Sequence, residues 1–315
     1  GGFRIAMERI GGRCVFSSEW DKYAQITYES NFGNKPYGDI TKEDVKNNIP
    51  VKFDLLCAGF PCQAFSIAGK RGGFDDTRGT LFFEVADIIK KHKPKAIFLE
   101  NVKGLYNHDR GKTLATILNV LRKDLNYFVP DPEIINSKYY GVPQNRERIF
   151  IVGFRNDLQI NDFEYPDNDL ISSSVEDIIE DQEVSVKYYL STQYLKTLEE
   201  HKSRHESKGN GFGYQILDSK SISNAIVCGG MGKERNLIID KRLSTFTPIT
   251  NIKGKVNRNG IRRLTPRECA RLQGFPESFK IIVSDAQAYK QFGNSVAIPA
   301  IEATGSKILT KLVNA

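Results

Sequence analysis

Residues 53–63 read Phe-Asp-Leu-Leu-Cys-Ala-Gly-Phe-Pro-Cys-Gln. The apolar run 53–58 predicts a strand, and 59–63 predict the loop that follows it. Strands and helices alternate on both sides of this stretch. Further strands are expected at 13–18, 96–99 and 149–154, and helices at 3–10, 21–31, 81–92 and 113–121. Alternation at this spacing is typical of βαβ units, so the sequence predicts an α/β fold with a mostly parallel sheet.

The alternation stops near Ile178. Residues 181–265 are polar, basic and rich in glycine, which predicts an inserted, smaller and irregular domain. Thr265-Pro266-Arg267-Glu268 predicts a helix start, with Thr265 as N-cap and Glu268 at the capping-box position. We therefore expect a main domain at 1–180 and 294–315, the inserted domain at 181–265, and a hinge at 266–293.

Composition and charge narrow the class of protein. The chain has 315 residues, 40% hydrophobic and 26% charged, as in ordinary globular proteins. No apolar run approaches the roughly 20 residues of a membrane-spanning helix. The formal net charge is +7, and residues 196–263 carry the whole surplus, with 14 Lys and Arg against 6 Asp and Glu. Such a segment is either a solvated basic surface or a module that faces phosphate groups.

The five cysteines are scattered, without a CxxC pair or a partner cluster of histidines. This argues against a metal site and a disulfide framework, and it favours reduced thiols in the cytoplasm. Four of them are interpreted as small buried apolar residues: Cys14, Cys57, Cys228 and Cys269. Cys62 differs, because it follows a proline just beyond a strand and precedes the basic, glycine-rich stretch 69–73. Nearby positive charge lowers the pKa of a thiol, so Cys62 is a candidate nucleophile.

Reactive side chains follow the predicted strands. Glu19 and Trp20 follow strand 13–18, Asp39 ends a short segment, and Glu100 follows strand 96–99. Ligands of open parallel sheets bind at the carboxyl ends of strands, so we expect these groups to converge. Glu19 comes about 20 residues after a Gly-Gly pair, the spacing at which an acid binds ribose hydroxyls. The pair alone is also typical of a simple turn, but with the other groups it favours a cofactor that carries a nucleoside.

Several motifs, in their usual order, resemble those of cytosine-C5 DNA methyltransferases. They are Gly59-Phe60-Pro61-Cys62-Gln63, Glu100-Asn101-Val102, Gln144-Asn145-Arg146-Glu147-Arg148, Arg263 to Pro276, and Gln291-Phe292-Gly293-Asn294-Ser295-Val296. The resemblance covers nearly the whole chain except about 170–260. It is strongest to small bacterial enzymes of the HhaI type and implies a Rossmann-like domain with an inserted target-recognition domain. A place in a restriction–modification system is expected.

The resemblance implies the catalytic roles. Cys62 attacks C6 of cytosine, Glu100 holds N3, Arg148 binds O2, and Arg146 helps to order the site. A base within a duplex cannot reach such a pocket, so the target cytosine is expected to flip out of the helix.

The resemblance also implies S-adenosylmethionine as the methyl donor, with S-adenosylhomocysteine as product. Its expected binding residues are Gly1, Gly2, Glu19, Trp20, Asp39, Ile40, Pro61, Leu81, Asn294 and Ser295. One departure concerns the first motif, which in the family reads Phe-x-Gly-x-Gly-Gly after a strand. Here only Gly1 and Gly2 are present, and the chain does not begin with Met. We expect the natural protein to have residues upstream.

Double-stranded DNA is the expected partner, bound by a monomer without a metal ion. Loop 63–76 resembles the family's mobile loop, although Ala68 stands where HhaI-type enzymes have a second serine. The loop around 229–236 is expected to read bases, since Arg and Asn suit guanine and adenine edges, with a plain hairpin turn as the alternative. The expected DNA-binding residues are Gln63, Ser66, Lys70, Arg71, Arg78, Gly230, Met231, Lys233, Arg235 and Asn236. Phosphate contacts are expected from Lys241, Arg242, Lys253, Lys255 and Arg258.

Three other functions are weighed against this one. A tRNA cytosine methyltransferase would share the catalytic core, but its Cys-Phe-Thr stretch is not found in the second domain. A DNA-binding regulator without activity would not need Cys62, Glu100, Arg146 and Arg148. A redox protein using Cys57 and Cys62 would pair a strand residue with a loop residue, which is an unusual arrangement.

Overall fold

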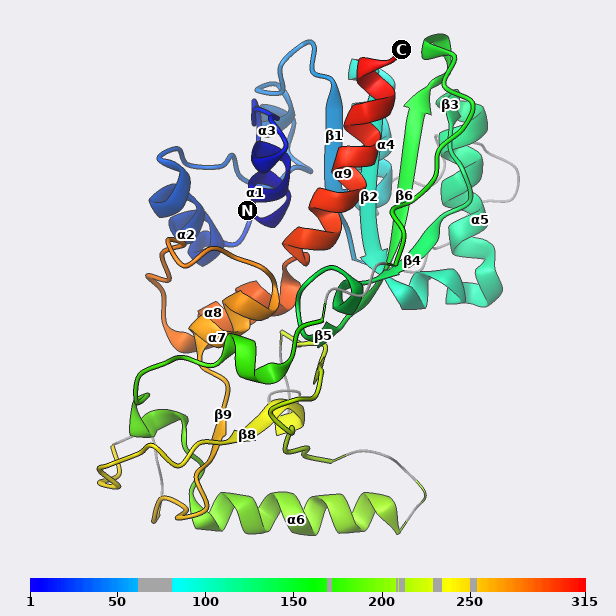
Figure 1. Cartoon of the computed structure of the whole chain (residues 1–315). Coiled ribbons are helices and arrows are strands. Elements are labelled where there is room, and N and C mark those ends of the chain that lie inside the picture. The colour runs from blue at the N-terminus through cyan, green and yellow to red at the C-terminus, as the bar shows by residue number, and fades with distance from the viewer. Residues whose placement is uncertain (62–80, 169–171, 208, 210–212, 229–233, 250–253) are drawn as a thin grey trace. The chain divides into compact units, whose positions relative to one another are not determined.

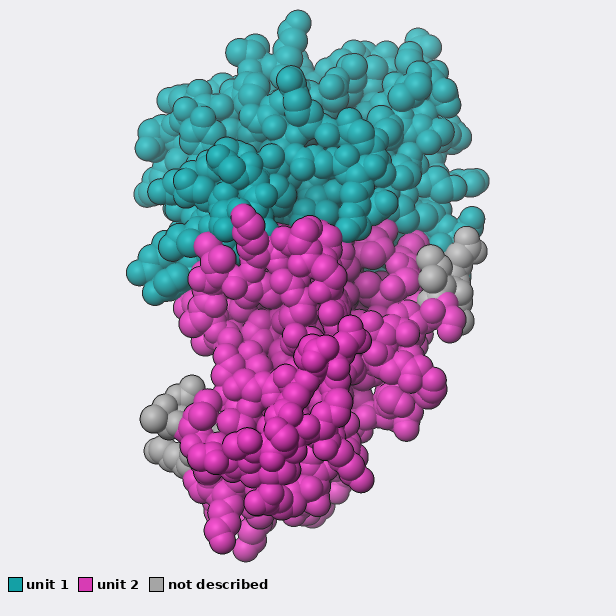
Figure 2. Space-filling model, turned by 60° about the vertical axis from the view of Figure 1, so that its left-hand side comes forward, with its two compact units in different colours: residues 1–136, 147–168, 300–315 teal, residues 137–146, 169–299 magenta. Residues whose placement is uncertain are grey.

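The computed structural model describes residues 1–61, 81–168, 172–207, 209, 213–228, 234–249 and 254–315. The chain forms two compact units, coloured separately in Figure 2. Unit 1 comprises residues 1–136, 147–168 and 300–315, and unit 2 comprises 137–146 and 169–299. Unit 2 thus contains the expected inserted domain and hinge, and also residues 137–146, 169–180 and 294–299, which were expected in the main domain. The functional roles given to the domains stay predictions.

Unit 1 contains the main sheet (Figure 1). Its described strands are β1 (Leu55–Gly59), β2 (Ala96–Val102), β3 (Tyr127–Phe128), β4 (Glu133–Asn136) and β6 (Glu147–Arg155). They lie in the order β1-β2-β6-β3, with β4 also paired to β6. The helices of this unit are α1 (Gly2–Arg9), α2 (Lys22–Phe32), α3 (Glu43–Lys46), α4 (Leu81–His92), α5 (Lys112–Asn119) and α9 (Ile298–Val313).

The α/β class is confirmed, but the sheet is mixed rather than mostly parallel. β1 and β2 pair in parallel, whereas β2, β3 and β4 each run antiparallel to β6. The reason is the length of the connections. A parallel pair needs a crossover of about a dozen residues or more, which α4 provides between β1 and β2. Only residues 137–146 join β4 to β6, so these two strands form a hairpin-like antiparallel pair.

The strand predicted at 13–18 is wrong. In this stretch only Ser18 forms a bridge, a parallel one with Tyr37. No other described strand lies beside it to extend the ladder. The predicted helices, by contrast, are confirmed to within a few residues, and α4 has the bounds expected from its apolar stripe. At α2 the side chain of Asp21 caps the helix by accepting from the amides of Tyr23 and Ala24.

The core lies on both faces of β2. Ile97 and Leu99 join the apolar cluster that includes residues of α4 and α5. Phe98 points to the other face, where its ring lies 5.4 Å from that of Phe3 in α1 and 5.2 Å from that of Phe150 in β6. Figure 1 shows α9 in front of the strands and α4 behind them. β2 is therefore an inner strand of the described sheet, paired with β1 on one side and β6 on the other.

Unit 2 is irregular, as predicted. Its described strands are the pairs β8 (Leu237–Ile239) with β9 (Ile261–Arg263), and β5 (Gln144–Asn145) with β7 (Ser223–Asn224). Its helices are α6 (Thr192–Glu206), α7 (Pro266–Leu272) and α8 (Asp285–Asn294). The capping box of α7 is confirmed, because Thr265 accepts from the amide of Glu268 and Glu268 accepts from the amide of Thr265. Gly274 ends this turn with φ of 75°.

Short helical turns complete the described chain. They are Lys103–Tyr106, His108–Gly111, Val120–Asp124, Ser137–Tyr139, Asn156–Leu158, Val175–Ile178 and Val186–Tyr188. No helix among the described residues is long and apolar enough to span a membrane.

Candidate active site

Glu100 and Arg148 form an ion pair at the carboxyl end of β2. Glu100 lies directly opposite Phe150 of β6, and Arg148 is two residues further along β6 on the same face of the sheet. Arg148 Nε is 3.1 Å from Glu100 Oε1, and both side chains are mostly buried. Glu100 belongs to β2 itself rather than to the loop after it, which corrects the expected end of that strand. Two predicted catalytic side chains are thus brought together.

Arg148 supplies a charged hydrogen-bond donor and Glu100 a charged acceptor, and both are largely shielded from solvent. Burial lowers the pKa of Arg148, and the neighbouring Glu100 carboxylate counteracts this effect. Glu147, the residue before Arg148, binds Lys103 instead, in an exposed ion pair of 2.9 Å. Such a surface pair contributes little, whereas a buried guanidinium and carboxylate can hold a polar ligand in one orientation.

The segment that leads to Cys62 is tied to the same end of β2. Asn101 is buried, and its side-chain amide donates to the carbonyl of Phe60 at 2.7 Å. Gly59 lies opposite Glu100, and a Cβ on Gly59 would come within 3.4 Å of Glu100 Oε2. Residues 59–61 therefore run beside Glu100. Five predicted side chains and Cys62 itself lie outside the described residues: Cys62, Gln63, Ser66, Lys70, Arg71 and Arg78.

Arg146 belongs to unit 2 and is almost completely buried there. Its guanidinium donates to the carbonyls of Ile226, Gly293 and Ser295, at 3.2, 3.2 and 2.6 Å. These contacts hold three chain segments together. They agree with the ordering role expected for Arg146, which is that of a positioning residue.

Gln144 and Gln273 are buried polar residues that the sequence reasoning missed. The Gln144 amide donates to the carbonyl of Leu272 and accepts from the amide of Ile226. Gln273 donates to the carbonyl of Phe292. Gln144 is the first residue of the Gln-x-Arg-x-Arg motif, and this position in the motif is the sequence signal that could have identified it as a site residue. Its two-sided amide can satisfy a donor and an acceptor at once.

The two parts of the expected nucleoside site lie side by side. The amide of Glu19 donates to the carbonyl of Tyr37 at 2.8 Å, and the Ser18 hydroxyl donates to the carbonyl of Gly38. This places Glu19 and Trp20 next to Asp39 and Ile40. Trp20 is 80% exposed, which is unusual for so large an apolar side chain and leaves its ring open for stacking.

The other predicted cofactor residues are spread over both units. Gly1 and Gly2 lie at the start of α1, and a Cβ on Gly1 would come within 2.7 Å of the Phe32 ring. Pro61 is exposed and Leu81 begins α4. Asn294, which is exposed, ends α8 in unit 2, and Ser295 follows it. The shared role of these residues in cofactor binding stays a prediction.

Some residues predicted to contact DNA in the basic segment are exposed, and others are occupied by contacts within the protein. Arg235 is exposed, but Asn236 does not fit its base-reading role, because it is buried and its amide bonds both backbone groups of Asn224. Arg242 does not fit a phosphate contact either, since its guanidinium donates to Asp240 and to two backbone carbonyls. Lys241, Lys255 and Arg258 are exposed. Gly230, Met231, Lys233 and Lys253 lie outside the described residues.

Burial distinguishes Cys57 from a reactive thiol. Burial raises the pKa of Cys57 to about 12, with a smaller contribution from Cys14. Such a thiol is inert at neutral pH, which argues against the redox function that pairs Cys57 with Cys62. Of the four cysteines expected to be buried, Cys269 is buried and Cys14 and Cys57 are partly exposed, whereas the expectation is wrong for Cys228, whose side chain is exposed. Among the described residues, no group of three or more His, Cys, Asp or Glu side chains is placed to hold a metal ion.

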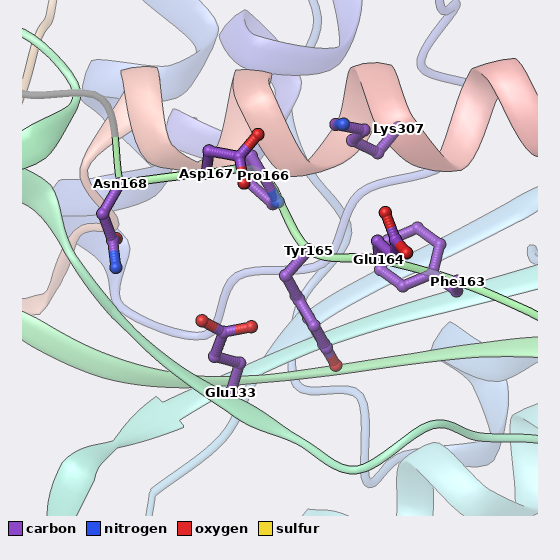
Figure 3. A pocket seen from close by; sticks show the side chains of 8 residues that line it. All are labelled: Glu133, Phe163, Glu164, Tyr165, Pro166, Asp167, Asn168 and Lys307. Carbon is purple, nitrogen blue, oxygen red and sulfur yellow. The ribbon is translucent and has the colours of Figure 1, made fainter.

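One surface pocket of unit 1 lies apart from these residues (Figure 3). It is lined by Glu133, residues 163–168 and Lys307. The Tyr165 hydroxyl donates to the carbonyl of Phe150 and accepts from the amide of Val152, so it fixes the wall of the pocket to β6. None of the predicted site residues lines this pocket.

Comparisons with known proteins agree on one family. The model of the C-5 cytosine-specific DNA methylases matches residues 1–310. The chain is 69% identical over 314 residues to the type II methyltransferase M.HpaII of Haemophilus parainfluenzae, covering 100% of this chain and 88% of that protein. It is 42% identical over 308 residues to the type II methyltransferase M.HhaI of Haemophilus parahaemolyticus, covering 96% and 89%.

Solved structures share the fold at low sequence identity. The crystal structure of the Dnmt2 methyltransferase of S. pombe superposes with a TM-score of 0.72, covering 99% of this chain and 96% of that one at 18% identity. A putative DNA modification methyltransferase from an E. coli prophage superposes with a TM-score of 0.63 at 21% identity. At such identities the likeness concerns the fold alone.

Proposed function

Since this chain belongs to the C-5 cytosine-specific DNA methylase family and is a sequence-specific DNA methyltransferase, we propose that it acts on a flipped-out cytosine through a covalent bond between Cys62 and C6. The observation that carries the proposal is the buried Glu100–Arg148 pair beside residues 59–61. It supplies a carboxylate and a guanidinium next to the segment that ends in Cys62.

Each residue has a role in the proposed reaction. The Cys62 thiolate forms a bond to C6, and the electrons of the C5–C6 double bond move toward C5. Glu100 faces N3, where a shared proton stabilises the negative charge that enters the ring, and Arg148 donates a hydrogen bond to O2. After C5 is methylated, a base removes the proton of C5. The C5–C6 double bond re-forms and the Cys62 thiolate leaves.

We assign S-adenosylmethionine to the site around Trp20 and Asp39. When bound, it supplies the electrophilic methyl group. The exposed Trp20 ring offers a stacking surface for adenine, and Glu19 is held next to residues 37–39 by backbone hydrogen bonds. Glu19 and Asp39 supply carboxylates for the ribose and adenine groups. These features fit a nucleoside, and no metal ion takes part in the proposed reaction.

Arg146 acts through the backbone rather than on the substrate. It fixes the carbonyls of Gly293 and Ser295, which flank Asn294, and it binds Ile226 on the way to residues 229–236. We propose that this arrangement keeps the cofactor-binding segment and the base-reading loop in a constant relation.

The experiment uses duplex DNA in which 5-fluorocytosine replaces the target cytosine, after the target has been mapped by methyl transfer. Fluorine at C5 cannot leave as a proton does, so the reaction stops with the enzyme attached to C6. We expect a protein–DNA adduct that survives denaturing electrophoresis and requires S-adenosylmethionine. Cys62→Ala should abolish it, and Cys228→Ala, which changes an exposed thiol, should not.

Two results would count against the proposal. An adduct that persists in Cys62→Ala would assign the nucleophile elsewhere. Methyl transfer to tRNA but to no duplex DNA would move the protein to the RNA-modifying branch.

A further inference from the structure

Glu234 has a buried carboxylate of which only one oxygen is used. Its Oε1 accepts from the Tyr194 hydroxyl at 3.1 Å and from Arg263 Nη2 at 2.9 Å. Its Oε2 is buried and has no hydrogen-bond partner among the described residues. Arg263 Nε is also buried and also lacks a hydrogen-bond partner among them. The side chain of Glu234 is only 5% exposed. In the cluster of Glu234, Tyr194 and Arg263, one acceptor oxygen and one donor nitrogen could therefore each form a further hydrogen bond.

An unsatisfied carboxylate oxygen is costly. A buried polar atom without a partner costs on the order of 1–3 kcal/mol, and more when it is charged. Native proteins leave few such atoms, and those that remain call for an explanation. A donor supplied by a ligand would recover this free energy.

The backbone around Glu234 is fixed. The carbonyl of Glu234 accepts from the amide of Gln215 at 2.9 Å, and the amide of Leu237 donates to the carbonyl of Gln215 at 3.0 Å. Arg263, which holds the carboxylate, lies opposite Leu237 in the β8–β9 pair. The orientation of the side chain is thus set by two strands and by α6, which carries Tyr194. A group held in this way suits specific recognition better than a flexible surface residue does.

The chemistry of Oε2 selects the ligand. A carboxylate accepts hydrogen bonds and donates none, so its partner must present an N–H or O–H group. In the major groove the exocyclic amino groups of cytosine (N4) and adenine (N6) are such donors, while guanine and thymine present acceptors at the corresponding positions. Glu234 also lies within the segment 229–236 that the sequence predicts to read bases.

We propose that Glu234 determines specificity at one base pair of the target by accepting, at Oε2, a hydrogen bond from an exocyclic amino group of cytosine or adenine. The inference rests on the proposed function, since it assumes that duplex DNA is the substrate. Tyr194 and Arg263 hold Oε1 and are positioning residues. Because Oε2 is covered in the DNA-free protein, the contact forms together with an adjustment of its neighbours on binding.

The test compares the wild-type protein with Glu234→Gln on a set of duplexes in which each base pair of the mapped site is exchanged in turn. Glutamine can keep the contacts of Oε1 and presents an NH2 group where Oε2 was. We expect discrimination in kcat/KM to fall by about 5- to 150-fold at one position only, the range for a single good base contact. At that position the variant should now favour a base with an acceptor. Glu199→Gln, the same exchange at an exposed carboxylate of α6, should keep the wild-type pattern.

A second measurement uses only the wild-type protein, so it does not depend on whether a variant folds. In wild-type assays, pyrimidin-2-one replaces each cytosine and purine replaces each adenine outside the methylated base, so that single amino groups are removed. We expect one such duplex to lose activity by a similar factor, and its identity distinguishes cytosine from adenine. The inference is overturned if no amino group matters, or if Glu234→Gln slows all duplexes equally. If wild-type protein methylates no duplex at all, the proposed function has failed instead.

Discussion

Arg148 shares a face of the sheet with Glu100 because it lies two residues along β6 from Phe150, the residue directly opposite Glu100. This geometry follows from antiparallel pairing, in which diagonal neighbours on one face come within reach of long side chains. Lys103 and Glu147 form a second ion pair beside the first, but an exposed one. The two pairs offer a matched comparison between a buried functional pair and a surface pair.

Glu100→Gln should lower kcat by about 100- to 10,000-fold, the usual contribution of a group that shares a proton with the reacting base. The affinity for duplex DNA should change only a few-fold, because many other contacts bind the duplex. Single-turnover methyl transfer and DNA binding measure the two effects.

Glu147→Gln is the control for this substitution, and its rate should stay within about two-fold of the wild type, since exposed ion pairs contribute little. An equal loss of rate in both variants would mean that the charge of this sheet edge, rather than a contact of Glu100 with the base, supports the reaction.

At the scale of elements, α8 depends on the close approach of another chain segment. A Cβ on Gly293 would come within 2.5 Å of the backbone amide nitrogen of Cys228. No flexible side chain is available to give way there, because the nearest atoms belong to backbone. Glycine at position 293 therefore lets the segment before the base-reading loop pack on the end of α8, next to Asn294.

Gly293→Ala should lower the free energy of unfolding by about 1–3 kcal/mol, the usual cost of overpacking. It should also raise the KM for S-adenosylmethionine, because Asn294 and Ser295 shift with the helix end. Urea unfolding and steady-state kinetics check these effects.

Gly104→Ala is the matched control, since the nearest atom to its Cβ would lie 3.9 Å away, in ordinary contact. We expect its stability to stay within about 0.5 kcal/mol of the wild type. A Gly293→Ala protein that is as stable as this control would show that the segment at Cys228 moves freely.

At the scale of the whole molecule, a buried charge cluster anchors unit 2. Arg262 is fully buried and donates to Asp240 at 2.9 Å and to Glu268 at 2.7 and 2.8 Å. Glu268 is also the capping residue of α7, so the β8–β9 pair and α7 share one carboxylate. Burial by itself raises the pKa of Asp240, but hydrogen bonds from Arg242 and Arg262 outweigh it and hold this pKa well below its usual range.

The stability of the protein should therefore depend on pH in acid. A carboxyl group with a depressed pKa in the folded state stabilises the fold above its unfolded pKa of about 3.9, and this contribution is lost as the pH falls below that value. Asp240→Asn should lower the free energy of unfolding by about 3 kcal/mol at neutral pH, because it leaves the buried Arg262 with one carboxylate partner, Glu268.

The variant should also show a shallower loss of stability than the wild type between about pH 5 and 3. Asp87→Asn, on the exposed side of α4, serves as control and should keep the wild-type slope. Urea unfolding across this range checks the comparison. Identical slopes in wild type and Asp240→Asn would mean that Asp240 is not the group that titrates.

Features that depend only on neighbouring residues could be predicted from the sequence. The apolar stripe of 81–92, the capping box at Thr265 and Glu268, the α/β class and the family were all predicted from it and confirmed. Helix periodicity, caps and motifs are short-range signals, so a single stretch of chain carries them completely.

Which side chains meet follows from how distant parts of the chain pack together. The antiparallel course of β6, the absence of a strand at 13–17 among the described residues, the burial of Asn236 and the hydrogen bonds of Arg242 to Asp240 were not evident beforehand. Each depends on a partner distant in sequence: a neighbouring strand, the backbone of Asn224, or the carboxylate of Asp240. Strand pairing and the satisfaction of buried polar groups are settled by what the rest of the chain places nearby, which local patterns do not record.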